Sequence, residues 1–200
     1  SVENSAAAVS RQSSSRGRVM LRYGLTEKDI EQIRTVLPEA GISVGHLVKQ
    51  KVFYRSTRVD ATVLGVAPEY FDLFRTEVVD GVNLASTHNR DGQRVVVLTQ
   101  PVASAVGALG GMVGKTIKIG PHSFEVIGVI RMPTQRGAGN IYMPFQTARR
   151  LYGTTTIKRE AGSFEFTRVE LGQAVIRMDD ENRVAAAAEV VNATLKRNHP

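Results

Sequence analysis

The sequence of 200 residues contains no cysteine. This absence excludes disulfide bonds, catalysis by a thiolate and metal sites with cysteine ligands. The chain also has no apolar run close to the roughly 18 residues that a membrane-spanning helix requires. Its first residues lack the charged, apolar and small-residue segments of a signal peptide. We therefore expect these residues to form one or two soluble domains. Because no signal peptide is recognisable, the sequence does not indicate the compartment.

Motifs for catalysis and cofactor binding are missing as well. The four histidines, at positions 46, 88, 122 and 199, stand alone, without a second ligand at metal-binding spacing. Residues 114–116 read Gly-Lys-Thr, like the end of a phosphate-binding loop, but Leu109 occupies the position of its first glycine. The glycines at 107, 110, 111 and 114 precede a predicted strand, whereas a dinucleotide loop precedes a helix. We therefore expect no catalytic residue, no metal, no cofactor and no enzyme activity.

Acidic residues are scarce relative to basic ones, so the formal net charge is +7. Two segments carry only basic charges, 40–59 and 126–159; their basic residues are Lys49, Lys51, Arg55, Arg58, Arg131, Arg136, Arg149, Arg150, Lys158 and Arg159. Such a surface can face solvent, a partner or lipid headgroups. Nucleic-acid binding is a weaker alternative, because no aromatic stacking platform or recognition helix accompanies these charges.

The stretch from 93 to 130 has the clearest pattern. Arg94–Leu98 is a β-branched run typical of a strand buried on both faces. Pro101 fits the first turn of a short helix entered at Thr99 or Gln100, and Gly110-Gly111 is expected to end it. Two strands then follow, at 115–119 and 124–130, with a turn at 120–122. The sequence therefore predicts strand, helix and hairpin.

Weaker signals divide the rest of the chain. We expect a flexible linker over residues 1–18, a strand at 18–23, and a helix that Thr26 caps and Pro38 ends. Two strands are expected within 41–66, with a turn at 54–58. Pro68 begins a short helix whose Tyr70, Phe71 and Phe74 should pack in the core, and turns follow at 80–81 and 89–92.

The C-terminal part predicts alternating loops and regular elements. Loops are expected at 132–139 and 153–163, on either side of a strand at 140–144 and a helix at 145–152. A strand at 169–178 and a last helix, capped by Asp179 and Asp180, complete the chain.

Three stretches of the sequence carry a family resemblance. They read GVAPEYFDLFRTEVVDGVNLASTHNRDGQ, VVVLTQPVASAVGALGGMVGKTIKIGPHSFEVIGVI followed by IYMPFQTARRLYG, and VELGQAVIRMDDENRVAAAAEVVNATLKRNHP. From about Gly24 to Pro200 the chain resembles the extracytoplasmic domain of MacB-type ABC transporter permeases, the MacB/FtsX-like family. It departs from the usual pattern at residues 81–83, where the family has Gly-Arg, and at 107–110, where it has Leu-Phe-Gly.

The resemblance implies an α+β fold with two subdomains. Residues 19–65 and 164–200 would form a discontinuous, membrane-proximal, porter-like α+β subdomain, and residues 66–163 an inserted β-rich, sabre-like subdomain. The two ends of the chain would then lie close together.

The resemblance also implies a function without catalysis. The domain would lie outside the cell membrane, on the extracytoplasmic side, and couple cytoplasmic ATP hydrolysis to export or mechanical work. Membrane helices and the ATPase would lie outside these 200 residues, and the full transporter would be a homodimer or heterodimer. Nucleic acid is not an expected partner. A stand-alone ligand- or peptide-binding module of the cell envelope is the main alternative, and a basic nucleic-acid-binding domain the weaker one.

Partner contact is expected at the two basic loops. Arg131, Arg136, Lys158 and Arg159 lie in or beside the segments 132–139 and 153–163. Loops on a rigid scaffold often carry recognition, so these four residues are the predicted contacts with a periplasmic adaptor or a substrate protein. Solvated loops without a partner are the equally weighted alternative.

Overall fold

A computed structural model describes most of the chain. The described residues are 18–25, 27–37, 41–74, 76–107, 111–132, 139–153, 155–160, 163–168 and 171–177. The chain divides into two compact units. Unit 1 comprises Ser1–Gly45 and Gly153–Pro200, and unit 2 comprises His46–Tyr152.

Unit 1 pairs the first and the last of the described strands in one sheet. Strand β1 (Arg18–Leu25) pairs antiparallel with β13 (Leu171–Arg177), and Met20 faces Val175 in the register. Strand β2 (Gly41–Val48) begins in unit 1 and follows β13 in the sheet order. The predicted strands at 18–23 and 169–178 are therefore confirmed where the structure describes them. The predicted C-terminal helix lies outside the described residues.

The first predicted helix is confirmed as α1 (Glu27–Val36). Ile33 is buried, and the backbone N–H of Leu37 still donates to the Ile33 carbonyl at 2.8 Å. Thr26 and Pro38, the predicted cap and stop, lie outside the described residues.

The loop predicted at 153–163 is wrong over most of its length. Strands β11 (Thr155–Glu160) and β12 (Ser163–Arg168) form an antiparallel hairpin, in which Ile157 faces Phe166. The prediction followed the polar composition of this segment. Its threonines, with the alternating Phe164 and Phe166 beyond it, favour strands instead.

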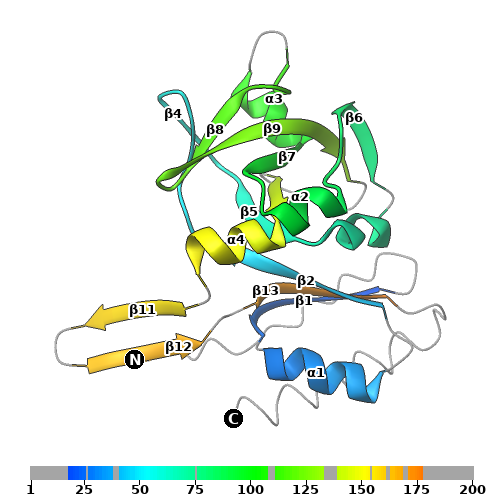
Figure 1. Ribbon diagram of the computed structural model, residues 1–200, viewed down its shortest axis with the longest axis vertical. Coiled ribbons are helices and arrows are strands. Elements are labelled where there is room, and N and C mark those ends of the chain that lie inside the picture. Colours follow the sequence, from blue (N-terminus) through cyan, green and yellow to red (C-terminus); the bar gives the residue numbers. More distant parts are fainter. Residues whose placement is uncertain are drawn as a thin grey trace. The chain divides into compact units, whose positions relative to one another are not determined.

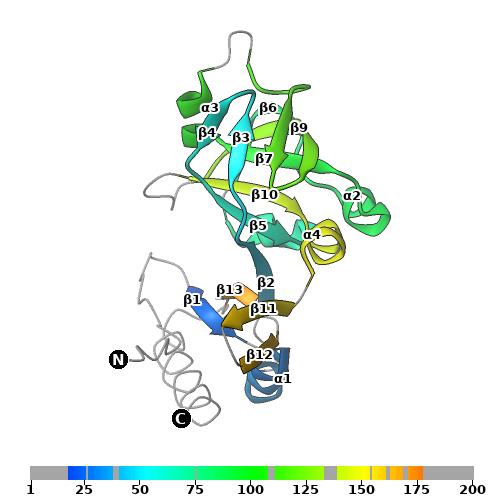
Figure 2. The ribbon, with the colours of Figure 1, turned by 90° about the vertical axis from the view of Figure 1, so that its left-hand side faces the viewer.

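Unit 2 is a mixed sheet covered by short helices (Figures 1 and 2). Its strands are β3 (Val52–Tyr54), β4 (Thr57–Val59), β5 (Thr62–Val66), β6 (Glu77–Gly81), β7 (Val95–Thr99), β8 (Thr116–Ile119), β9 (His122–Arg131) and β10 (Asn140–Pro144). The order is β5-β10-β7-β9-β8-β3-β4, and β6 pairs with β9. The pairs β5–β10 and β7–β9 are parallel, and β10–β7 is antiparallel. The helices are η1 (Pro68–Leu73, a 3-10 helix), α2 (Ser86–Asp91), α3 (Gln100–Val106) and α4 (Phe145–Tyr152).

The central stretch folds largely as its pattern predicts. All five residues of β7 are buried, and α3 begins after Thr99 with Pro101 in its first turn. Strands β8 and β9 form the predicted hairpin. The helix ends earlier than predicted, because Gly107 already adopts a left-handed conformation (φ 62°), which glycine tolerates without a Cβ penalty.

Three predictions for the first half of unit 2 need correction. Residues 41–66 hold four strands, and the turn predicted at 54–58 shrinks to Arg55 and Ser56, with Arg55 at φ 53°. Asp80 and Gly81 end strand β6 instead of forming a turn. Asn89 to Asp91 belong to α2, because the His88 side chain accepts the backbone N–H of Ala85 and Gly92 closes the helix at φ 60°. The Asp-Gly pairs at 80–81 and 91–92 are typical of turns, but here they end a strand and a helix.

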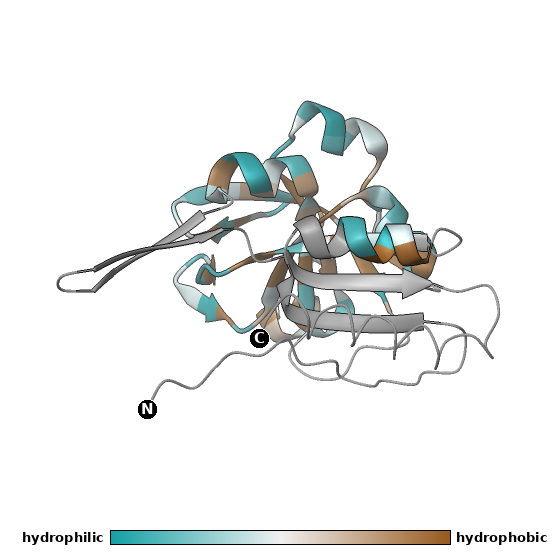
Figure 3. Cartoon of the chain, turned by 90° about the horizontal axis from the view of Figure 1, so that it is seen from below, coloured by the Kyte–Doolittle hydropathy of each residue, from teal (hydrophilic) through white to brown (hydrophobic). Residues whose placement is uncertain are grey.

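Aromatic packing confirms the predicted role of the short helix after Pro68. Tyr70 and Phe71 are buried, and their ring centroids lie 5.6 and 5.2 Å from that of Tyr142 in β10. Helix α4 is amphipathic, as its mixed colours in Figure 3 show: Thr147 and Ala148 are buried, whereas Arg149 and Arg150 are exposed. Helices η1 and α4 therefore each bury one face against their surroundings.

Candidate contact surface

Strand β6 carries a group of exposed side chains. Val78, Val79 and Val82 are 45%, 42% and 56% exposed, although valine is usually buried. All five residues of β6 are exposed, and among the described strands β6 pairs only with β9. An edge strand with exposed apolar side chains is a typical site of pairing with another chain. We call Glu77, Val78, Val79, Val82 and Arg131 the β6 surface.

Glycines hold β6 in this position. A side chain on Gly128 of β9 would collide with the carbonyl of Val82, and Gly81 adopts φ 70°. The backbone N–H of Val82 donates to the Ile127 carbonyl at 2.9 Å. The register shifts between Val78 and Asp80, as at a β-bulge. Backbone contacts therefore attach β6 to the sheet, which leaves its side chains outside.

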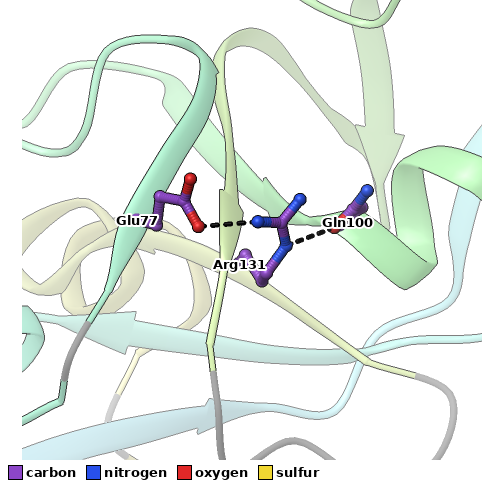
Figure 4. A network of polar contacts seen from close by, with 3 residues as sticks. All are labelled: Glu77, Gln100 and Arg131. Atoms are coloured by element: carbon purple, nitrogen blue, oxygen red, sulfur yellow. Dashed lines mark hydrogen bonds and ion pairs between the residues drawn. The ribbon is translucent and has the colours of Figure 1, made fainter.

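Arg131 connects three elements of this surface (Figure 4). Its Nη1 atom lies 2.6 Å from the Glu77 Oε2 atom of β6, and its Nε–H donates to the Gln100 Oε1 atom of α3 at 2.9 Å. The side chains of Arg131 and Glu77 are 53% and 64% exposed. An exposed ion pair of this kind contributes about 0 to 1 kcal/mol. Arg131 is thus positioned by its neighbours while it remains accessible to a partner.

Hydrogen bonds fix the described residues on both sides of the segment 133–138. The Thr99 hydroxyl donates to the Asn140 carbonyl and accepts the Asn140 backbone N–H, both at 3.0 Å. The Tyr142 hydroxyl accepts from Asn140 Nδ2 at 2.9 Å and donates to Met132 Sδ at 3.1 Å. Met132 itself is buried. The described ends of the basic loop predicted at 132–139 are therefore anchored to β7 and β10.

The four predicted contact residues fall into different parts of the molecule. Arg131 belongs to unit 2, whereas Lys158 and Arg159 belong to β11 in unit 1, opposite Glu165 and Phe164 in the hairpin register. Arg136 lies outside the described residues. Their role as partner contacts stays a prediction.

Sequence reasoning missed the exposed valines of β6. The Asp-Gly pair in the run Glu-Val-Val-Asp-Gly-Val predicts a turn. Its β-branched residues, flanked by two acids, could have indicated a short edge strand with charges at its ends.

Within the described residues, no three His, Asp or Glu side chains are close enough to hold a metal ion. In the same part of the chain, no helix has the length and apolar character needed to cross a membrane.

A family profile decides the assignment. The profile described as the MacB-like periplasmic core domain matches residues 2–194. The chain belongs to the MacB-like periplasmic core domain family. The resemblance inferred from the sequence is therefore confirmed, and the assignment favours a permease domain over the two alternatives. Members of this family are periplasmic domains of transporter permeases, not catalytic domains, so this MacB-like domain lies on the extracytoplasmic side of a membrane transporter.

Individual relatives agree with this assignment. The macrolide export ATP-binding/permease protein MacB of Chromobacterium violaceum is 27% identical over 154 residues, which cover 75% of this chain and 22% of the relative. The ABC transporter permease YknZ of Bacillus subtilis is 23% identical over 170 residues, which cover 84% of this chain and 40% of the relative. The chain therefore spans about a fifth to two fifths of the length of these curated relatives.

Solved structures share the fold. The extracellular domain of the ABC-type transporter YknZ from Gram-positive bacteria matches with a TM-score of 0.64 at 19% identity, covering 88% of this chain and 84% of that domain. The periplasmic region of MacB from Actinobacillus actinomycetemcomitans matches with a TM-score of 0.64 at 18% identity, covering 92% and 84%. The predicted α+β fold of the MacB type is confirmed.

Proposed function

We propose that this MacB-like domain couples ATP hydrolysis in the cytoplasm to export or mechanical work outside the membrane, without catalysing a reaction itself. Family membership supports a place in an ABC transporter. The observation that carries the proposal is the pairing of β1 with β13. Segments that enter and leave the domain are thereby joined in one sheet of unit 1, so that a movement of flanking membrane helices would act on this unit directly.

Unit 2 is placed in the chain to transmit such a movement from unit 1. Its residues 46–152 form one continuous insertion between the two parts of unit 1, with a buried core of its own. A separately packed unit can respond as a rigid body to a displacement at its two chain connections. In this proposal unit 1 receives the movement and unit 2 transmits it to a partner or substrate.

The proposed partners follow from the same scheme. The transporter would contain a cytoplasmic ATPase, on the same or another chain, and two permease copies or two related permeases. A periplasmic adaptor or a substrate protein would contact Arg131, Arg136, Lys158 and Arg159. Since several relatives carry the name macrolide export protein, a macrolide is the first substrate to test.

Excision of unit 2 tests the coupling. In the full-length transporter, residues 46–152 are replaced by a short Gly-Ser linker, and the variant is reconstituted in liposomes. We expect basal ATP hydrolysis to persist and ATP-dependent erythromycin uptake into inside-out liposomes to fall to background. A variant that transports erythromycin with the wild-type ratio of transport to hydrolysis would contradict the proposal.

A disulfide reports whether unit 1 still folds in the excised protein. Met20 and Val175 face each other across β1 and β13, and the domain contains no cysteine of its own. Cysteines at both positions should cross-link equally well in the complete and the excised transporter. Equal cross-linking with lost transport assigns the loss to unit 2 and not to misfolding of unit 1. If the wild type itself does not move erythromycin, the substrate choice is wrong, and stimulation of ATP hydrolysis by other compounds is measured instead.

A further inference from the structure

A pocket lies between the last strand of the unit 2 sheet and helix α3. Its volume is about 390 Å³, within the range of small-ligand and side-chain pockets. The strand side contributes Arg58, Val59 and Asp60, and the helix side contributes Pro101, Ala105 and Val106. Strand β4 and helix α3 lie next to each other in Figure 2. This pocket is separate from the β6 surface and has no part in the proposed coupling.

The strand side of the pocket is a free sheet edge. Strand β4 is the last strand in the order, and among the described strands it pairs only with β3. The turn contains only Arg55 and Ser56, so Tyr54 and Thr57 form the hydrogen-bonded pair next to it. Along an antiparallel pair of strands, hydrogen-bonded residue pairs alternate with pairs that are not hydrogen-bonded, so the next pair, which contains Arg58, is not hydrogen-bonded. The backbone N–H and carbonyl of Arg58 therefore point away from β3. They are available to an added strand.

The walls of the pocket suit an apolar side chain. Val59 and Tyr54 are buried beneath it, while Pro101 and Ala105 of α3 are exposed on its other side. A free strand edge beside an apolar helix face is the arrangement by which peptides bind through β-augmentation. Main-chain hydrogen bonds give affinity in this mode, and side-chain pockets give specificity.

The charge around the pocket selects the sign of the ligand. Arg55, Lys51 and Arg58 are exposed on or beside the β3–β4 hairpin, and Lys118 of β8 faces Phe53 in the register. Arg58 has no ion pair or side-chain hydrogen bond with any described residue. Arg58 and Asp60 both line the pocket, so the excess of positive charge comes from Lys51, Arg55 and Lys118 outside its lining. The excess positive charge favours an acidic ligand.

We propose that β4 and α3 form a binding site for an extended acidic peptide segment of a partner protein. The peptide adds as a strand to the edge of β4, one of its apolar side chains enters the pocket beside Ala105, and its carboxylates face Arg58 and the neighbouring basic residues. The proposal also gives a role to the acid-free segment 40–59, which the proposed coupling does not use.

Titration of the isotope-labelled 200-residue chain with synthetic peptides tests this site by NMR. The probes are acetylated octapeptides with alternating threonine and glutamate around a central valine, leucine, isoleucine or phenylalanine. At least one should shift the backbone amide signals of residues 57–60 and 101–106. At saturation it should also slow hydrogen exchange of the Arg58 amide, because strand addition would occupy that N–H. Peptides with lysine in place of glutamate, or with a central serine, should bind about tenfold more weakly or not at all.

Two matched variants distinguish peptide binding in the pocket from a general effect of added charge. Ala105→Glu places a carboxylate on the apolar wall and should weaken peptide binding by at least about tenfold. Ser104→Glu adds the same charge at an exposed position of α3 that does not line the pocket, and should change binding less than about threefold. The proposal is overturned if no acidic peptide shifts these residues, if the lysine or serine peptides bind equally well, or if the two glutamate variants behave alike.

Discussion

Gly65 of β5 lies directly against Ala148 of α4. A Cβ atom added to Gly65 would collide with the Cβ of Ala148, so the helix packs on the strand backbone itself. Both residues are buried, so this contact helps to fix α4 on the sheet of unit 2.

Gly65→Ala should therefore destabilise the chain. Overpacking of a tight core contact costs about 1 to 3 kcal/mol, measured as a lower midpoint of urea unfolding. The double variant Gly65→Ala with Ala148→Gly removes the collision and should be more stable than the sum of the two single changes predicts. Purely additive effects in this cycle would show that the two residues are not in contact.

His46 predicts a pH dependence of stability. Its side chain is buried against the Phe145 ring, and its Nδ1 atom has no hydrogen-bond partner among the described residues. Burial, and secondarily the positive charge of Arg149, lower the pKa of His46 from its ordinary value of 6.5. The unfolded chain therefore binds a proton at a pH where the folded chain does not, so this stability contribution is complete above pH 6.5 and is lost as the pH falls below it.

Denaturation at several pH values measures this effect. The unfolding free energy of the wild type should fall more steeply between neutral and mildly acidic pH than that of His46→Gln, which cannot titrate there. Parallel pH profiles of the two proteins would contradict the assignment to His46.

The Arg131–Glu77 ion pair should contribute little to stability. Both side chains are more than half exposed, so a double-mutant cycle with Arg131→Gln and Glu77→Gln should give a coupling energy of about 0.2 to 1 kcal/mol. High salt should reduce this energy further. A coupling energy several times larger would mean that Arg131 is primarily structural, and that its substitution cannot be used to test partner contact.

The predicted partner contacts are tested by charge reversal. Arg136→Glu and Lys158→Glu together should impair transport by the full-length transporter in cells while its level in the membrane is unchanged. Arg149→Glu and Arg150→Glu, which reverse two exposed charges on α4, are the matched control. Unchanged transport in the first variant, or equal loss in both, would leave Arg136 and Lys158 as solvated residues without a contact role.

Several elements could be predicted from the sequence because local signals agreed with the tertiary structure. The β-branched run of β7 and Pro101 in α3 are examples, since burial and helix entry follow from these residues themselves. The β11–β12 hairpin and β6 were missed because their polar and charged residues concealed a strand pattern. Pairing with a distant strand, here β9 with β6, is not encoded in the local sequence.

The pocket beside β4 could not be predicted for a similar reason. It needs Arg58 and Ala105 on neighbouring elements, and only the tertiary contact between β4 and α3 brings these distant parts of the sequence together. The sequence predicted the cluster of basic residues in 40–59, but not the helix that lies beside it.

Distance measurements by EPR test the proposed coupling most directly. Spin labels on Arg34→Cys in unit 1 and Lys118→Cys in unit 2 use two exposed positions of a domain without native cysteine. A control pair on Glu69→Cys and Lys118→Cys lies within unit 2. In the full-length transporter, with its other cysteines replaced, we predict that trapping with ATP and vanadate shifts the distance distribution between the units and leaves that of the control pair unchanged. Identical distributions between the units with and without trapped nucleotide would contradict the coupling.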